Sequence, residues 1–185
     1  MFRLLHRIVV VGFWVLLVLI GWFAYEHRTR IQPVLDEIEI LKHLQLTTDP
    51  SRVIARMTGE VYQITGPDSF RLRTADGVRY HLRLEAAQAP PESTPAARRW
   101  REQGARRLSH WLLSNRVEVD LVYTNEYRLG LGFAFRAGTN VNVQLVKSGL
   151  ARINPDQLKN LPLREQFALL SAQQEAQTAR LGMWK

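Results

Sequence analysis

The stretch DSFRLRTADGVRYHLRLEA, residues 68–86, has the pattern of two β-strands joined by a tight turn. Phe70 and Leu72 alternate with arginines in its first half, and apolar and basic residues alternate in the same way in its second half. A period of two is typical of a strand with one buried face and one exposed face. The Asp76-Gly77 pair between the halves tolerates the positive φ that tight hairpins require. The segment therefore predicts a β-hairpin.

The segments on either side of this hairpin extend it to a small barrel. Residues 52–64, RVIARMTGEVYQI, are rich in β-branched and aromatic residues and predict a preceding strand. The elements expected after the hairpin are a helix from Ser93 or Thr94 to about Asn115, strands at 116–124 and 129–138, a short helix that stops at Gly149, and a helix from about Pro162 to Leu181. Three strands, a helix, two strands and two helices form the order of a five-stranded OB-fold barrel. The predicted fold class is α+β, mainly β, with three helices.

Residues at helical spacing predict the buried faces of the first and the last of these helices. For the first they are Ala97, Trp100, Gly104, Leu108, Trp111 and Leu112, and for the last Phe167, Leu170, Gln174 and Thr178. Trp184 is expected in the core together with Trp100 and Trp111.

An appendage precedes the barrel. Residues 8–25, IVVVGFWVLLVLIGWFAY, carry no charge and are long enough to cross a hydrocarbon layer of about 30 Å as a helix. A cleaved signal peptide is the alternative, but such segments end in small residues, whereas this one ends in aromatic residues that suit a membrane interface. We expect a tail at 1–7, a transmembrane anchor at 8–25, a helical stalk at 26–51 and a domain at 52–185 outside the cytoplasm. The apolar stripe of the stalk either packs on the domain or pairs two copies into a homodimer.

Composition restricts the chemistry of the 185-residue chain. It contains no cysteine, which excludes disulfides, thiolate zinc sites and cysteine nucleophiles. Its five histidines are scattered singly and show no metal-ligand spacing.

Positive charge is concentrated in the predicted domain. The net charge of +8 lies entirely in residues 51–185, since basic and acidic residues balance in residues 1–50. A basic domain suits an anionic partner such as nucleic acid or lipid headgroups, although excess arginine also serves solubility alone. The same two interpretations apply to the arginines of the first helix, which are Arg98, Arg99, Arg101, Arg106 and Arg107. Tyr123 and Tyr127 are candidates for stacking on bases.

Five segments follow one another in an order that ends in Gly-x-Trp. They are GEVYQITGPDSFRL (59–72), RLEAAQAPPE (83–92), YRLGLGFAF (127–135), NVNVQLVKSGLA (140–151) and AQQEAQTARLGMW (172–184). In this order and spacing the chain resembles the staphylococcal nuclease (thermonuclease-like) family from about Arg56 to Trp184. In that family two aspartates hold a calcium ion, a glutamate activates water, and two arginines stabilise the transition state of phosphodiester hydrolysis.

The resemblance carries over only part of this site. The first aspartate falls on Asp68 once Pro67 is admitted as an extra residue, although an Asp in such a turn is more often a backbone cap. The first arginine falls on Arg83, which either holds phosphate or pairs with Asp68 or Glu85. The second aspartate falls on Gln88.

The other two catalytic positions are also changed. The glutamate falls on Pro91, with Glu92 one place late, and the second arginine falls on Leu129, with Arg128 one place early. Such a slip near a strand reverses the direction of a side chain unless a bulge restores the register. Asn140 and Asn142 match an Asn-x-Asn pair, for which we expect a structural role at the start of the short helix.

The expected function is therefore that of an impaired, membrane-anchored nuclease-like protein. A neutral amide replaces a charged ligand of the calcium site, so we expect hydrolysis near background, no cofactor, and a binding role toward nucleic acid or another anionic partner through Arg71, Arg83, Tyr127 and Arg128. One alternative is an active calcium-dependent nuclease in which Arg83, Glu92 and Arg128 are catalytic and Asp68 is a weak metal ligand. Another is a structural module that dimerises through its stalk.

Overall fold

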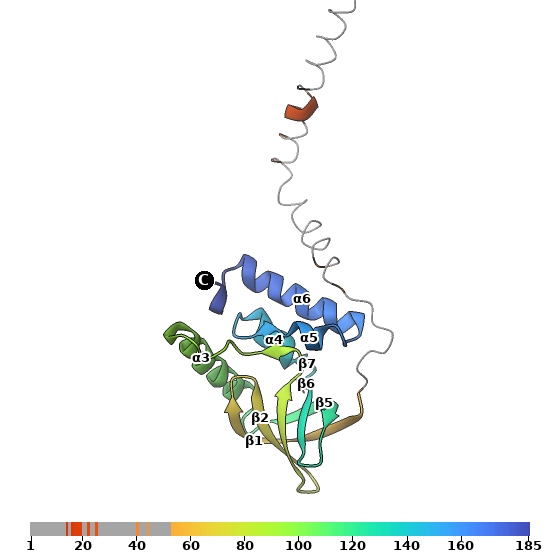
Figure 1. Cartoon of the computed structure of the whole chain (residues 1–185). Coiled ribbons are helices and arrows are strands. Elements are labelled where there is room, and N and C mark those ends of the chain that lie inside the picture. Colours follow the sequence, from red (N-terminus) through yellow and green to blue (C-terminus); the bar gives the residue numbers. More distant parts are fainter. Residues whose placement is uncertain are drawn as a thin grey trace, which may run out of the picture. The chain divides into compact units, whose positions relative to one another are not determined.

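The computed structural model describes residues 53–185 and, before them, only Trp14, Leu16–Leu19, Trp22, Tyr25, Ile40 and Leu44. The chain divides into two units after Lys42, and the barrel belongs to the second unit (Figure 1). The tail, most of the predicted anchor at 8–25 and most of the predicted stalk at 26–51 lie outside the described residues. None of the helices in the described part of the chain combines the length and the apolar character needed to cross a membrane.

Five strands form the predicted barrel. β1 (Ala55–Gly66), β2 (Ser69–Thr74) and β3 (Arg79–Leu84) make an antiparallel meander. β5 (Arg116–Thr124) pairs with β1, and β6 (Leu129–Arg136) pairs with β5. A parallel pairing between β6 and β3 then closes the sheet, which confirms the OB-like order of elements.

The hairpin of β2 and β3 forms as its sequence predicts. Phe70 and Leu72 of β2 face Leu82 and other buried residues of the core, while the arginines between them are exposed. Gly77 has a φ of 82°, and its N–H donates to the carbonyl of Thr74 at 2.9 Å. The alternation of the sequence thus becomes an apolar inner surface and a basic outer surface.

Helices cover the side and one end of the barrel (Figure 1). α3 (Pro95–Leu112) begins after Thr94, whose hydroxyl accepts from the N–H of Ala97 at 3.1 Å, as expected for an N-cap. The remaining helices are α4 (Val141–Lys147), α5 (Pro155–Leu158), α6 (Leu163–Thr178) and a short 3-10 turn, η1 (Gly182–Trp184). Asn140 caps α4 by accepting from the N–H of Val143 at 3.2 Å, in agreement with its predicted structural role.

Several short elements were not predicted. β4 (Ala87–Gln88) pairs with β8 (Arg152–Ile153) in a separate two-stranded sheet. β7 (Thr139–Asn140) pairs with the end of β6. Two residues are too few to show a period, so only the tertiary pairing reveals these strands.

The buried face of α6 differs from the predicted one. Gln166, Leu169, Ala172 and Ala176 are buried, whereas Phe167 is 40% exposed. Two alanines allow close packing against α4, and the amide of Gln166 donates to the carbonyl of Leu161 at 2.8 Å, so a polar residue is held inside. The predicted face, through Phe167, Leu170, Gln174 and Thr178, is offset from the buried one, which includes the polar Gln166.

Trp100 and Trp111 pack against the core, as predicted, although neither is fully buried. Trp100, Trp111 and Trp184 are only partly buried. The guanidinium of Arg107 lies 5.6 Å from the ring of Trp111, and the ammonium of Lys185 lies 5.9 Å from that of Trp100. An indole can pack one side against the core and leave its other side to a cation.

Candidate nucleic-acid interface

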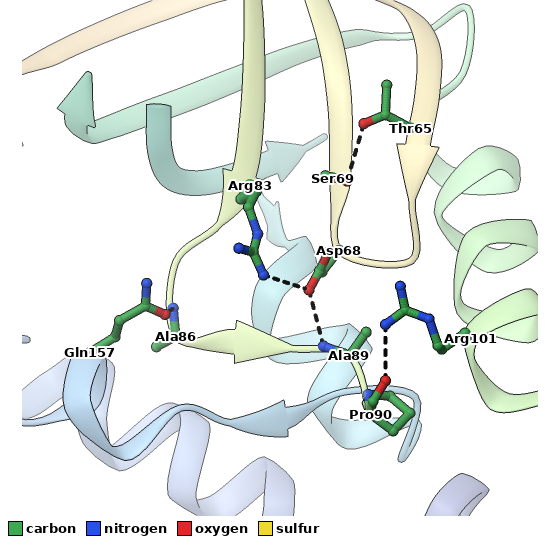
Figure 2. A network of polar contacts seen from close by, with 9 residues as sticks. All are labelled: Thr65, Asp68, Ser69, Arg83, Ala86, Ala89, Pro90, Arg101 and Gln157. Carbon is green, nitrogen blue, oxygen red and sulfur yellow. Dashed lines mark hydrogen bonds and ion pairs between the residues drawn. The ribbon is translucent and has the colours of Figure 1, made fainter. Parts of the chain in front are cut away.

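Asp68 lies between β1 and β2 and is 8% exposed. Its Oδ2 accepts from Nη2 of Arg83 at 3.3 Å and from the N–H of Ala89 at 3.1 Å (Figure 2). The carboxylate thus ties the start of β2 to the segment after β4, and it is the acidic partner of Arg83. Of the two partners that the sequence offered Arg83, the ion pair forms with Asp68.

Glu92 lies apart from this contact, before α3. It is exposed, and its carboxylate is 3.8 Å from Nε of Arg98 and 4.0 Å from Nε of Arg101. Arg101 also donates to the carbonyl of Pro90 at 2.9 Å (Figure 2). Arg101 therefore fixes the loop between β4 and α3, a role with no sequence signal because its acceptor is a backbone carbonyl eleven residues away.

Gln88 is half-buried in β4, opposite Arg152 of β8. Just before it, Ala86 has a φ of 56°, and its N–H donates to Oε1 of Gln157 at 3.0 Å (Figure 2). These contacts hold the β4 segment in place from α5. Gln157 is a further positioning residue that the sequence did not single out.

The donor set does not fit a calcium ion. Ca²⁺ takes about six to eight oxygen ligands, several of them carboxylates. Residues 53–185 and the few described positions before them contain no group of three or more histidine, aspartate or glutamate side chains placed to hold a metal. Asp68 offers one carboxylate, whose Oδ2 already accepts two hydrogen bonds, and the neighbouring Gln88 offers a neutral amide.

Basic side chains form a continuous row on the outer surface of β2 and β3. This row, here called the basic face, consists of Arg71, Arg73, Arg79, His81 and Arg83. Strand register sets them side by side, with Arg71 opposite His81 and Arg73 opposite Arg79. The register continues onto the neighbouring strands, where Leu131 of β6 lies between Arg83 and the exposed Tyr123 of β5. Two strand spacings of about 4.8 Å put Tyr123 roughly 10 Å from Arg83 across the sheet.

Part of this charge has no acidic partner. Arg73 pairs with Glu60 at 3.4 Å and Arg83 with Asp68. Arg71 instead donates to the neutral amide of Gln63 at 3.3 Å, and Arg79 lies 5.8 Å from the ring of Tyr62. Within the described residues, no carboxylate lies in ion-pairing range of Arg71 or Arg79, so both guanidinium groups are free to meet an anion.

His81 lies in the middle of the basic face. Its Nε2 is 2.9 Å from the hydroxyl oxygen of Thr65, which in turn donates to Ser69 at 3.1 Å. Partial burial, followed by the positive charges of Arg71 and Arg83, lowers the pKa of His81 below its ordinary value. The lowered pKa favours the neutral imidazole, so His81 adds little positive charge to the basic face. Its contact with Thr65, sixteen residues away, leaves no pattern in the sequence.

Tyr127 and Arg128 lie in the loop between β5 and β6. Tyr127 is 75% exposed, and Oδ1 of Asn125 accepts from its N–H at 3.0 Å. Arg128 has a φ of 57° and lies three residues before Leu131, the register partner of Arg83. Its carbonyl accepts from the N–H of His81 at 3.0 Å, so its backbone lies beside the basic face, level with His81 rather than with Arg83. Leu129 is 45% exposed beside His81.

Glu85 is the one strongly perturbed acid near this region. It is 4% exposed, and its Oε2 is buried without a hydrogen-bond partner among the described residues. Burial raises the pKa of Glu85 to about 7. Asn142 holds the backbone here, because its amide donates to the carbonyls of Glu85 at 2.8 Å and Gly132 at 3.2 Å and accepts from Ala134.

Comparison with protein-family models gives one finding. The model described as "Staphylococcal nuclease homologue" matches residues 81–185, which run from β3 to the end of the chain. A comparison with curated proteins gives no match.

Proposed function

The chain belongs to the family of staphylococcal nuclease homologues, and from this premise we propose that its barrel domain binds single-stranded nucleic acid without cleaving it. The observation that carries the proposal is the use of Asp68. In a nuclease of this family, this carboxylate would have to bind a calcium ion. Here it accepts hydrogen bonds from Arg83 and from the N–H of Ala89 instead. The site is built as a basic surface on a rigid barrel.

The proposed contacts follow from the basic face. Arg71 and Arg79 would meet phosphate oxygens, because guanidinium groups bind them in fixed, bidentate geometry. The rings of Tyr123 and Tyr127 are exposed beside this charge and would stack on unpaired bases. A positively charged groove combined with stacking rings is typical of proteins that bind single strands with little sequence preference.

Loss of cleavage follows from three changed positions. Gln88 replaces a metal-binding carboxylate, Pro91 cannot activate water, and Leu129 offers no positive charge to a transition state. Positioned catalytic groups each contribute roughly a hundredfold or more to the rate. We therefore expect hydrolysis near background, with no dependence on calcium.

The placement of the protein is part of the proposal. Residues 8–25 would anchor it as a single-pass membrane protein with the barrel outside the cytoplasm, and the stalk would support a homodimer. Protease added to intact cells is expected to degrade the barrel domain. Retention of the full domain under that treatment would contradict the orientation.

Leu41 belongs to the apolar stripe of the stalk. Leu41→Asp is therefore expected to abolish the dimer in cross-linking, whereas an unchanged dimer would contradict the role of the stalk.

Cleavage assays test the central point. Quenched-fluorophore single-stranded DNA and RNA are incubated with the purified full chain, with calcium and with chelator, beside a Gln88→Asp, Pro91→Glu double variant. We expect no calcium-dependent cleavage by the unmodified chain and a gain of activity in the double variant. Calcium-dependent cleavage by the unmodified chain, lost in Glu92→Gln or Arg128→Ala, would overturn the proposal and favour an active nuclease at the membrane surface.

A further inference from the structure

A pocket lies at the C-terminal end of α3, between that helix, the β6–β7 turn and α4. Its volume is about 330 Å³, and its lining residues are Trp111, Arg136, Ala137, Thr139, Val141 and Gln144. The guanidinium of Arg107, one helical turn before Trp111, lies 5.6 Å from the indole ring. The pocket is therefore bordered by one aromatic ring and two arginines.

Both arginines lack an acidic partner. Arg136 is half-buried, and neither it nor Arg107 has a carboxylate in ion-pairing range within the described part of the chain. No lining residue of this pocket is acidic. Partial burial of an unpaired guanidinium is unfavourable unless an anion compensates it.

A two-residue turn closes the pocket. Ala137 and Gly138 connect the paired residues Arg136 and Thr139, and their φ angles are 47° and 76°. Two central residues with positive φ are typical of a type I′ hairpin turn, in which alanine is strained. The small side chain of Ala137 lines the pocket, where a larger one would occupy ligand space.

The chemistry of the pocket fits a nucleotide. A base can lie against the part of the indole that faces the pocket and against the guanidinium of Arg107 over the ring, while Arg136 receives the phosphate. Thr139 and Gln144 supply donors and acceptors for a base edge. Ligand pockets start at about 300 Å³, so the site suits a single nucleotide unit. A flat lipid surface fits less well, because the exposed residues in the middle of α3 are polar or charged and offer no apolar group to insert.

We propose that this pocket, here called the Trp111 site, is a second nucleotide-binding site that holds one nucleotide of a bound single strand. The inference rests on the proposed function for the class of its ligand, while the location is independent of the basic face. Arg101, which fixes the loop beside Asp68, and Trp111 are ten residues apart on α3. This separation corresponds to about 15 Å, so one strand can contact both regions.

Photo-crosslinking tests the inference. The purified full chain is irradiated in chelator with single-stranded DNA that carries photoreactive halogenated uracils, and the tryptic peptides are identified by mass spectrometry. Residues 108–116 contain Trp111, and residues 117–128 contain Tyr123 and Tyr127. Crosslinks in both peptides are the expected result. Crosslinks in 117–128 alone would overturn the Trp111 site and leave the proposed function standing.

Other outcomes separate the two claims further. Crosslinks in 108–116 alone would support the Trp111 site and contradict binding at the basic face. The absence of any crosslink would overturn both.

Matched variants exclude a general effect of charge. Arg136→Gln and Arg107→Ala are each expected to lower crosslinking in the peptide with Trp111 roughly tenfold, the effect of a lost charge-assisted contact, and to leave the peptide with Tyr127 unchanged. Arg106→Ala removes an equal charge one position away, from an exposed arginine that pairs with Glu102 at 3.5 Å, and should change neither. An equal decrease in all three variants, or none in any, would overturn the assignment. Arg107 is exposed, so its variant tests the site even if Arg136→Gln does not fold.

Discussion

Single residues decide whether this site holds a cation or an anion. Asp68 is the one acidic side chain in direct contact with Arg83 among the described residues, and its Oδ2 is already bonded to two donors. Such a carboxylate stabilises the position of the arginine and lowers the positive charge of the basic face. In a calcium-dependent nuclease the same carboxylate would be needed for binding of the metal and substrate.

Asp68→Asn is therefore expected to strengthen binding. The variant keeps an oxygen for the N–H of Ala89 but removes the negative charge beside Arg83. We expect the affinity for single-stranded DNA, measured in chelator, to rise a few-fold. The gain in binding free energy is about 1 kcal/mol or less, because Arg83 is partly exposed to solvent. Fluorescence anisotropy measures it.

Asp156→Asn is the control for this variant. Asp156 of α5 pairs at 3.2 Å with Lys159 rather than with a residue of the basic face, so the same change of charge should have a smaller effect. Weaker binding by Asp68→Asn would argue that the carboxylate assists the ligand and would contradict the account.

Glu85 makes the stability of the barrel depend on pH. Its pKa is about 7 in the folded state against 4.5 in the unfolded chain, so the folded state keeps a proton that the unfolded state has lost between these values. The free energy of unfolding should fall as pH rises from 4.5 to 7, by about 3 kcal/mol in total, and this loss persists above pH 7. Glu85→Gln should flatten the profile and be more stable than the unmodified chain at pH 8.

Urea unfolding of the full chain at several pH values measures this dependence. Glu92→Gln makes the same chemical change at an exposed position and should leave the profile as it is. If Glu85→Gln shows the same decline between pH 4.5 and 7 as the unmodified chain, another group is responsible for it.

A close contact between Gly149 and Gly182 holds the C-terminal segment against the end of α4. Gly149 and Gly182 both have positive φ, of 68° and 54°. The N–H of Met183 donates to the carbonyl of Gly149 at 3.0 Å, and a Cβ on Gly182 would lie 2.1 Å from that oxygen. The backbones approach too closely for any side chain.

Gly182→Ala is expected to destabilise the barrel strongly. The positive φ costs about 1 to 2 kcal/mol for alanine, and the backbone clash adds roughly 1 to 3 kcal/mol. Gly77→Ala is the matched control, since Gly77 has a φ of 82° but no atom within 4 Å of an added Cβ. The free energy of unfolding of this control should fall only by the cost of the positive φ. Equal losses in the free energy of unfolding of the two variants would show that the close approach is unimportant.

Elements that depend on local chemistry could be predicted, and those that depend on distant contacts could not. The β2–β3 hairpin followed from alternation and Asp76-Gly77, and α3 from Thr94 before Pro95. β4 and β8 were missed because each has two residues and exists only through its partner. The buried face of α6 was missed because Gln166 is buried through a bond to the carbonyl of Leu161.

The same limit applies to the candidate site. The sequence named Asp68, Arg83, Gln88 and Tyr127 as separate residues, but left the partner of Arg83 open. The contact of Arg101 with Pro90 and that of His81 with Thr65 join residues far apart in sequence, so only the folded chain reveals them.

For the whole molecule, the distribution of charge is the property that a partner would sense. The entire net charge of +8 lies in residues 51–185, and the basic face and the Trp111 site lie in the same barrel domain. A surface that neutralises phosphates releases counterions from the nucleic acid, so its binding must weaken as salt rises. A surface that relied on apolar contacts would respond little.

The most direct test is the salt dependence of binding to labelled single-stranded DNA by the full chain, measured by anisotropy in chelator. We predict measurable binding without calcium, an intact oligonucleotide afterwards, and a linear fall of log K with log salt concentration. Each phosphate contact adds about −0.7 to the slope, so an Arg71→Ala, Arg79→Ala variant should have a slope shallower by roughly 1.4. A slope near zero, or binding that requires calcium and ends in cleavage, would contradict the account.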